Sequence, residues 1–254
     1  MERWFPRLSS FQAGALATAA LVALALIACG DEGEDAFPTA AVTPAPTPAP
    51  SERVTFETAD GVALVGDLWP ADGSSVVVFA HMRGANRTAW APAVERVLER
   101  RFAALSFDFR GHGESGDREA DLGKIDLDLE AAVAFARSRG YARVFVVGAS
   151  MGGTAALALA AREDLAGVAV LSSPASFEGI DAAAAVGSVQ EPALFVAANG
   201  DQPYRREVEE LHAAAPGEKR LVLVPGNAHG TNLLGDARVS RQVLDALVAF
   251  LGVP

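Results

Sequence analysis

The segment Val144-Phe145-Val146-Val147-Gly148-Ala149-Ser150-Met151-Gly152 decides the fold of this chain. Its first four residues are apolar without alternation, as in a strand that is covered on both faces. An Ala-rich helical pattern begins directly after the serine. A sharp turn from strand to helix needs small residues two positions before and two positions after the serine, and Gly148 and Gly152 stand there. The segment therefore predicts a serine hydroxyl that projects from the end of a strand at a helix N-terminus.

The rest of the chain repeats this alternation of apolar runs and helical patterns. The repetition predicts the α/β class, with a mostly parallel sheet and helices on both faces. Two earlier runs, separated by Asp60-Gly61, predict an antiparallel hairpin. Strands are expected at 54–57, 62–69, 76–80, 103–107, 144–147, 168–171, 194–197 and 221–224, and helices at 89–100, 123–139, 151–163, 203–214 and 237–251. The stretch between the runs at 168–171 and 194–197 has room for one short helix, such as 180–186, but for no large cap domain.

Composition excludes several classes of protein. The chain has 254 residues, is 50% hydrophobic and carries a formal net charge of −11 at pH 7. A nucleic-acid partner is not expected, because binding phosphates needs clustered Lys and Arg. The single cysteine excludes an internal disulfide and a multi-cysteine metal site. The Gly-rich strings lack the dinucleotide-binding spacing and no P-loop occurs, so we expect neither a cofactor nor a metal.

The N-terminus has the pattern of an export signal. Arg3 and Arg7 precede an almost wholly apolar stretch over 11–28. Leu26-Ile27-Ala28-Cys29 resembles the bacterial lipobox, in which the cysteine is lipidated and becomes the N-terminus after cleavage. The alternatives are an uncleaved membrane anchor and a conventionally cleaved signal peptide. We expect a lipoprotein that is held on a bacterial membrane and faces the periplasm or the cell exterior.

Residues 29–52 have the composition of a spacer. They contain acidic residues followed by Pro44-Ala45-Pro46-Thr47-Pro48-Ala49-Pro50, a sequence that favours extended polyproline II. The expected organisation is therefore a signal peptide over 1–28, the lipidated Cys29 with its linker over 29–52, and one folded domain over 53–254. Its negative charge would be repelled by anionic lipid, so the lipid anchor is expected to make the membrane contact.

Two further motifs carry a family resemblance. Asp108-Phe109-Arg110-Gly111-His112-Gly113-Glu114-Ser115 resembles the D-x-R-G-x-G-x-S loop of lipase and esterase-like proteins, and His81-Met82-Arg83-Gly84 resembles their oxyanion loop. Together with Gly148-Ala149-Ser150-Met151-Gly152, these motifs make residues 53–254 similar to the α/β-hydrolase fold superfamily. The resemblance implies a mostly parallel sheet of about eight strands. Met82 stands where that family usually has glycine.

The resemblance implies a Ser–His–Asp triad. A serine hydroxyl needs a base, and His229 follows the last expected strand, which is the family's position for that base. Asp201 follows the strand at 194–197 and is the expected acid; Asp181 is the alternative, because some members place the acid after the preceding strand. The order Ser150, Asp201, His229 is the order of α/β hydrolases.

The resemblance also implies an oxyanion hole formed by the backbone N–H groups of Met82 and Met151. The two thioethers either line the acyl pocket or fill gaps in the core. His81 and His112 are expected to structure their loops, and His212 to lie on an acidic helix surface. Asp108 is expected to hold its own loop without a catalytic role.

These residues lead us to expect a serine hydrolase that cleaves small or medium carboxylic esters through an acyl-enzyme. A peptidase, thioesterase, acyltransferase or cofactor-free haloperoxidase would use the same triad. A non-catalytic surface-binding protein on the same fold is the alternative from another class. The sequence does not indicate the oligomeric state or the acyl-chain preference.

Overall fold

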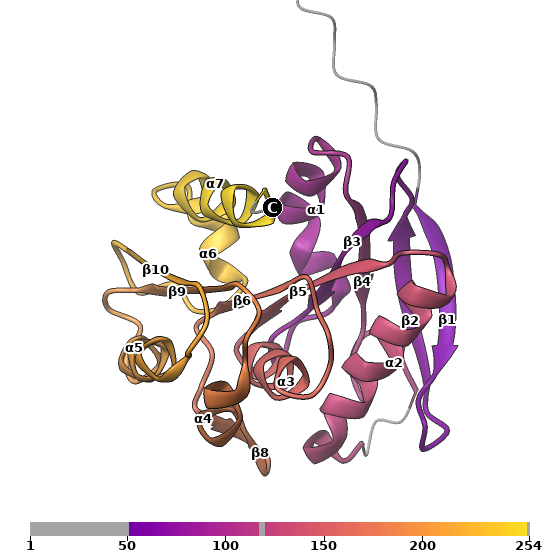
Figure 1. Cartoon of the computed structure of the whole chain (residues 1–254), viewed down its shortest axis with the longest axis horizontal. Coiled ribbons are helices and arrows are strands. Elements are labelled where there is room, and N and C mark those ends of the chain that lie inside the picture. Colours follow the sequence, from indigo (N-terminus) through magenta and orange to yellow (C-terminus); the bar gives the residue numbers. More distant parts are fainter. Residues whose placement is uncertain (1–50, 117–119, 253–254) are drawn as a thin grey trace, which may run out of the picture. The chain divides into compact units, whose positions relative to one another are not determined.

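The computed structural model describes residues 51–116 and 120–252, which are built around one eight-stranded sheet (Figure 1). The signal peptide, the lipidation site Cys29 and the linker up to residue 50 lie outside the described residues. Within residues 51–116 and 120–252, no helix has both the length and the apolar character that crossing a membrane requires.

The strands follow the order β1-β2-β4-β3-β5-β6-β9-β10 across the sheet. The pairs β1–β2 and β2–β4 are antiparallel, and the other five pairings are parallel. The predicted hairpin and the mostly parallel sheet are thus confirmed. The bounds are β1 (Glu52–Glu57), β2 (Ala63–Trp69), β3 (Ser75–Ala80), β4 (Ala103–Phe107), β5 (Arg143–Ala149), β6 (Gly167–Leu171), β9 (Ala193–Ala198) and β10 (Lys219–Val224).

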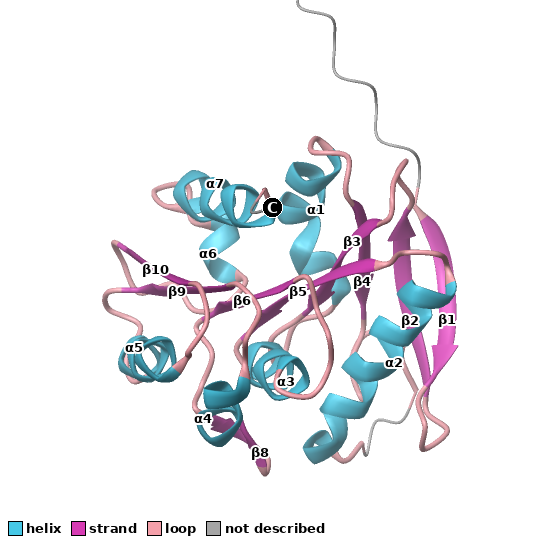
Figure 2. Cartoon of the chain, viewed as in Figure 1, coloured by secondary structure: helices cyan, strands magenta, loops and turns pink. Residues whose placement is uncertain are grey.

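Helices cover both faces of the sheet (Figure 2). One face carries α1 (Ala91–Leu98), α6 (Asn232–Gly235) and α7 (Ser240–Leu251). The other carries α2 (Ile125–Ser138), α3 (Met151–Ala160), α4 (Ala182–Ala185) and α5 (Tyr204–Ala214). Short 3₁₀ turns, η1 (Arg87–Trp90) and η2 (Leu122–Lys124), precede α1 and α2.

The two faces hold two separate hydrophobic cores, and β3 contributes to both. Val76 and Val78 belong to the core under α2 and α3, whereas Val77 and Phe79 belong to the core under α1 and α7. Successive side chains of a strand point to opposite faces of its sheet, so a strand covered on both sides must be apolar throughout. This requirement explains the unalternating runs in the sequence.

The stretch between β6 and β9 is short, as predicted. It contains a hairpin of β7 (Ser176–Phe177) and β8 (Ile180–Asp181), then α4 and the 3₁₀ turn η3 (Val186–Ser188). The predicted helix over 180–186 begins at Ala182 instead, because the Asp181 side chain accepts the Ala184 N–H at 2.9 Å and caps α4. The hairpin was not predicted, since two-residue strands leave no periodic pattern. These 21 residues leave no room for a cap domain.

The turn from β5 into α3 packs backbone against backbone. A Cβ on Gly148 would lie 2.3 Å from the Gly152 carbonyl oxygen, and a Cβ on Gly152 would lie 2.3 Å from the Ala80 carbonyl oxygen. Real Cβ atoms do not approach backbone atoms so closely. The two glycines therefore permit the contact between the first turn of α3 and the end of β3.

We predict that Gly152→Ala lowers the free energy of unfolding by about 3 kcal/mol or more, because the obstructing atoms belong to the backbone of a buried strand. Gly187→Ala is the matched control: nothing lies within 4 Å of its Cβ position, and a change below about 0.5 kcal/mol is expected. Urea unfolding followed by circular dichroism measures both. Equal midpoints for the two variants would contradict the close contact.

Candidate active site

Ser150 occupies the junction between β5 and α3 in a strained backbone conformation. Its φ of 49° and ψ of −119° are unusual for a residue with a side chain. Its N–H donates to the Leu171 carbonyl at 2.9 Å, and its own carbonyl accepts the Gly153 N–H at 2.8 Å. These bonds hold the strained turn in place. The side chain is half-buried rather than enclosed.

His229 and Asp201 complete a hydrogen-bonded chain from Ser150. His229 Nε2 lies 2.9 Å from Ser150 Oγ, and Nδ1 lies 3.1 and 3.0 Å from the two carboxylate oxygens of Asp201. A carboxylate only accepts, so Nδ1–H donates to Asp201 and the neutral ring leaves Nε2 free to accept the Ser150 O–H. The Asp201 side chain is 7% exposed and that of His229 is 27% exposed. A substrate would therefore approach this hydrogen-bonded chain at Ser150, the end opposite the buried Asp201.

The sheet brings these three residues together although 79 positions separate Ser150 from His229. Each follows the carboxyl end of a parallel strand: β5 for Ser150, β9 for Asp201 and β10 for His229. Such ends meet at one edge of an α/β sheet, where ligands usually bind. Asp181, the alternative acid, instead caps α4 and takes no part in this hydrogen-bonded chain.

Met82 lies beside the triad. A Cβ on Gly230, the residue after His229, would fall 2.8 Å from Met82 Sδ and 3.6 Å from the Cβ of Ala149, the residue before Ser150. Gly230 has a φ of +56° and provides the space for the methionine that stands in place of the usual glycine. The Met82 and Met151 N–H groups have no acceptor within the described residues. Both donors are thus available to a bound oxygen.

The two methionine side chains differ in their surroundings. Met151 is fully buried and belongs to the core under α2 and α3, where its thioether fills space between apolar residues. Met82 is only partly buried and packs on the edge of the other core. Of the two thioethers proposed to line an acyl pocket, only that of Met82 remains a candidate.

Tyr204 is a further residue of the site that sequence reasoning missed. Its ring centroid lies 4.2 Å from that of His229, with 45° between the ring planes. Tyr204 is the first residue of α5, three positions after Asp201. A helix that starts immediately after the acid loop was the available signal, because its first turn must face the histidine that the acid contacts. The ring limits the orientations that His229 can adopt.

The other three histidines have structural contacts. His81 is fully buried: its Nδ1–H donates to the Met82 carbonyl at 2.8 Å, and its Nε2 accepts the Phe109 N–H at 3.0 Å. His112 Nδ1 lies 3.0 Å from the Arg110 carbonyl. His212 is half-buried and packs edge-on against Phe195, so it is more buried than the predicted surface position. The helical pattern alone did not reveal that this face of α5 covers β9.

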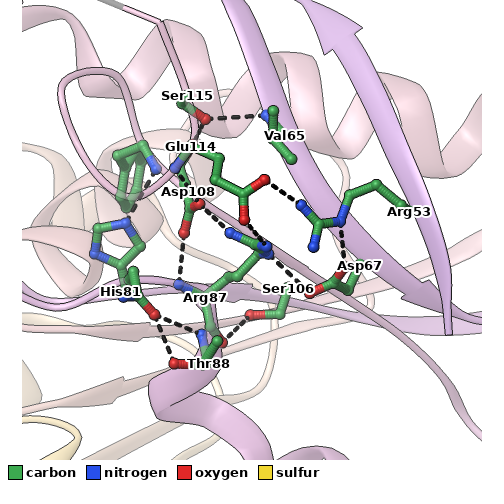
Figure 3. A network of polar contacts seen from close by, with 12 residues as sticks. Arg53, Val65, Asp67, His81, Arg87, Thr88, Ser106, Asp108, Glu114 and Ser115 are labelled. Atoms are coloured by element: carbon green, nitrogen blue, oxygen red, sulfur yellow. Dashed lines mark hydrogen bonds and ion pairs between the residues drawn. The ribbon is translucent and has the colours of Figure 1, made fainter. Parts of the chain in front are cut away.

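Asp108 holds its loop by binding Arg87, a residue distant in the sequence, and not its neighbour Arg110 (Figure 3). Its fully buried carboxylate accepts the Arg87 N–H at 2.7 Å and the Glu114 N–H at 2.9 Å, and it pairs with the Arg87 guanidinium. The neighbouring Arg110 instead pairs with Asp128 and Asp60. Asp108 thus connects two loops, and no role in the triad chain is seen for it.

Three comparisons with known proteins agree with this architecture. The model of a family described as "Alpha/beta hydrolase family" matches residues 77–193. The uncharacterized protein YfhR of Escherichia coli strain K12 is 28% identical over 217 residues, covering 72% of this chain and 75% of that protein. The uncharacterized protein Rv2307c of Mycobacterium tuberculosis strain H37Rv is 29% identical over 242 residues, with 85% of each chain covered.

Among solved structures, the esterase Pf2001 of Pyrococcus furiosus superposes with a TM-score of 0.71 at 21% identity, covering 79% of this chain and 91% of the esterase. The chain therefore has the α/β-hydrolase fold, and its site has the Ser–His–Asp arrangement found in hydrolases of that fold. Within the described residues no cluster of three or more His, Cys, Asp or Glu side chains could hold a metal ion.

The buried His81 predicts a pH-dependent stability. Burial, with a smaller contribution from His112, lowers the pKa of His81 to about 4, against the opposing effects of the Met82 carbonyl and Asp108. Between pH 6.5 and pH 4, His81 binds a proton in the unfolded chain but not in the folded chain. The free energy of unfolding therefore falls as the pH falls. The contribution is about 3 kcal/mol, from 1.36 kcal/mol for each pKa unit.

His81→Gln removes this titration while keeping a polar side chain. We expect the difference in unfolding free energy between wild type and His81→Gln to change by about 3 kcal/mol from pH 7 to pH 4, in favour of the variant at low pH. Urea unfolding at several pH values measures it. Parallel pH profiles would show that His81 titrates normally.

Proposed function

We propose that this protein is a serine hydrolase that cleaves small or medium carboxylic esters through an acyl-enzyme. The observation that supports the proposal most directly is the continuous chain from Ser150 Oγ through both ring nitrogens of His229 to the buried Asp201 carboxylate. A serine hydroxyl becomes a nucleophile when a positioned base removes its proton. The half-buried Ser150 leaves space for a substrate to approach.

The mechanism follows from the tautomer of His229. Nε2 takes the Ser150 proton as Oγ attacks the acyl carbonyl carbon, and Asp201 stabilises the resulting imidazolium through Nδ1–H. The tetrahedral intermediate collapses when the imidazolium gives its proton to the leaving alcohol. Water, deprotonated by His229, then attacks the acyl-enzyme and releases the carboxylic acid and the free Ser150 hydroxyl.

The N–H groups of Met82 and Met151 would stabilise the oxyanion of the tetrahedral intermediate. The Met151 N–H stands at the N-terminus of α3, where the helix dipole adds positive potential. The Met82 N–H follows the end of β3, which packs against Gly152. Removing one donor of such a pair typically lowers kcat by about 10²- to 10³-fold.

The proposed substrate class is based on the short stretch of chain between β6 and β9, which contains no cap domain. The hairpin β7–β8 and the short helices α4 and η3 are all that the chain places between β6 and β9. Because the described residues include no cap domain, we propose small or medium carboxylic esters as substrates. Peptide, thioester and acyl-transfer substrates, or perhydrolysis in a haloperoxidase reaction, are the alternatives that the same triad would serve, and a non-catalytic binding protein would need none of its three members.

We predict that a fluorophosphonate probe labels the purified protein at Ser150, because the probe reacts with activated serines whatever their natural substrate. His229→Ala should reduce the labelling rate by at least about 10³-fold, because the base that activates Ser150 is lost. Asp201→Ala should also slow it strongly. Peptide mass mapping identifies the labelled residue.

Asp181→Ala is the matched control for Asp201→Ala, because Asp181 is the alternative acid and takes no part in the hydrogen-bonded chain. We expect Asp181→Ala to label at the wild-type rate. Equal losses in both variants would contradict the assignment of Asp201. A folded wild type that does not react would favour the non-catalytic binding protein.

We also propose that the protein is anchored to a bacterial membrane through lipid on Cys29. The support is the sequence alone: the apolar stretch over 11–28, the lipobox-like Leu26-Ile27-Ala28-Cys29 and the Pro-rich spacer.

We expect wild type expressed in a bacterium to incorporate an alkyne-tagged fatty acid during growth, and Cys29→Ala to incorporate none. Gel fluorescence after a click reaction measures the label, and mass spectrometry of the mature N-terminus locates it. Ser51→Ala is a control outside the lipobox and should label fully. Wild type that stays with the membrane without any label would indicate an uncleaved anchor instead.

A further inference from the structure

Residues 81–87, which run from the end of β3 to the first residue of η1, carry the proposed oxyanion donor of Met82 and are fastened at both ends to the loop over 108–115 (Figure 3). We infer that His81 and Arg87 are positioning residues, which hold the Met82 N–H where the oxyanion forms. This inference rests on the proposed serine-hydrolase function.

His81 fastens the first end. The His81 side chain makes two hydrogen bonds, one as a donor and one as an acceptor. Its Nδ1–H donates to the Met82 carbonyl at 2.8 Å, and its Nε2 accepts the Phe109 N–H at 3.0 Å. The ring is fully buried, with the Phe109 ring centroid at 5.1 Å and that of His112 at 5.0 Å. The Met82 N–H belongs to the peptide group that follows His81, so holding the His81 side chain against the Phe109 N–H restricts the direction of the Met82 N–H.

Arg87 fastens the second end. Its backbone N–H and its guanidinium both bind the Asp108 carboxylate, and its carbonyl accepts the Ser106 hydroxyl at 2.8 Å. The guanidinium also donates to Asp67 at 2.8 Å and to Glu114 at 2.7 Å. The Arg87 side chain is only 6% exposed. A buried guanidinium that binds three carboxylates in this way has one well-defined position.

Between the two ends the segment has little to hold it. Arg83 and Gly84 are exposed, and Gly84 has a φ of +76°. The one backbone bond that closes the turn is from the Ala85 N–H to the Met82 carbonyl at 3.1 Å. Arg83 faces Glu178 at 4.0 Å, and both side chains are more than half exposed, so this pair contributes little. The Met82 side chain packs on the edge of the core under α1 and α7 and beside Gly230, and the two fastened ends hold the backbone around it.

The loop that receives both ends is itself rigid. It wraps around Asp108 so closely that a Cβ on Gly113 would fall 2.1 Å from the Asp108 carboxylate. Ser115 ties the loop to the sheet, because its hydroxyl donates to the Asp108 carbonyl and accepts the Val65 N–H at 3.0 Å. Through His81 and Arg87, this loop therefore holds residues 81–87 in place relative to β2 and β4.

A displaced oxyanion donor affects the transition state and not ground-state binding. His81→Leu, which removes both bonds at similar volume, should lower kcat by about 10- to 100-fold with KM changed less than about 3-fold, a smaller loss than for deleting a donor outright. His212→Leu is the matched control, because it replaces a half-buried histidine of α5 outside this network, and it should leave both constants unchanged.

Two amide variants provide a rescue test. The side-chain oxygen of Gln reaches about as far as Nε2, so His81→Gln can still accept the Phe109 N–H, whereas the shorter Asn cannot. We expect His81→Gln to retain kcat within about 5-fold of wild type and His81→Asn to resemble His81→Leu. Equal or reversed values for Gln and Asn would overturn the inference, even if His81→Leu fails to fold.

The experiment measures kcat and KM with p-nitrophenyl acetate, and the affinity for a trifluoromethyl ketone that adds to Ser150 as a hemiketal. Across the variants, ketone affinity should fall in proportion to kcat/KM, as expected for a lost transition-state contact. A folded His81→Leu with wild-type kcat, or with a loss confined to KM, would overturn the inference.

Amide hydrogen exchange distinguishes this inference from the proposed function. His81→Leu and His81→Asn should speed exchange in the peptide covering residues 82–87, and His81→Gln should not. If wild type proves inert toward esters and the probe while this exchange pattern appears, the proposed function fails and the positioning of the segment stands. Unchanged exchange in His81→Leu would overturn the positioning itself.

Discussion

The rest of the site depends on one close backbone contact, between the first turn of α3 and the end of β3. Gly152 approaches the carbonyl groups of Ala80 and His81 at a distance that no other residue permits. This contact brings the N-terminus of α3, with the Met151 N–H, beside the segment that carries the Met82 N–H. A donor pair for an oxyanion requires two chain segments within a few ångströms, and the two segments here come from different crossovers of the sheet.

The buried ion pairs fix the conformation of loops rather than add stability. Arg110 belongs to the loop over 108–115, and Arg87 binds this loop through Asp108. Both arginines are almost fully buried, together with Asp108 and Asp128. Replacing a buried ion pair by apolar residues is often neutral or stabilising, because desolvation offsets the attraction. What such a pair provides is a single arrangement of its partners. We infer that this property suits a segment whose backbone N–H must point in one direction.

The triad combines a buried acid with a partly exposed base and nucleophile. The Asp201 side chain is buried, whereas His229 and Ser150 are both half-buried. Tyr204 packs against the imidazole and limits its motion. The proposed reaction needs a fixed charge, an oriented base and an accessible oxygen, and the buried Asp201 and the half-buried His229 and Ser150 provide them.

Local patterns in the sequence were sufficient to predict the eight strands of the main sheet, the hairpin at its start and the junction that carries Ser150, because periodicity and turn chemistry are properties of neighbouring residues. His229 and Asp201 were assigned through the resemblance to the α/β-hydrolase superfamily, which places its base and acid after these strands, and Asp201 was already preferred to Asp181. The burial of Met151, the contact of Tyr204 with His229 and the pairing of Asp108 with Arg87 were decided by the tertiary structure alone. Each depends on which strand ends and helix faces meet in space, and no pattern confined to neighbouring residues contains that information.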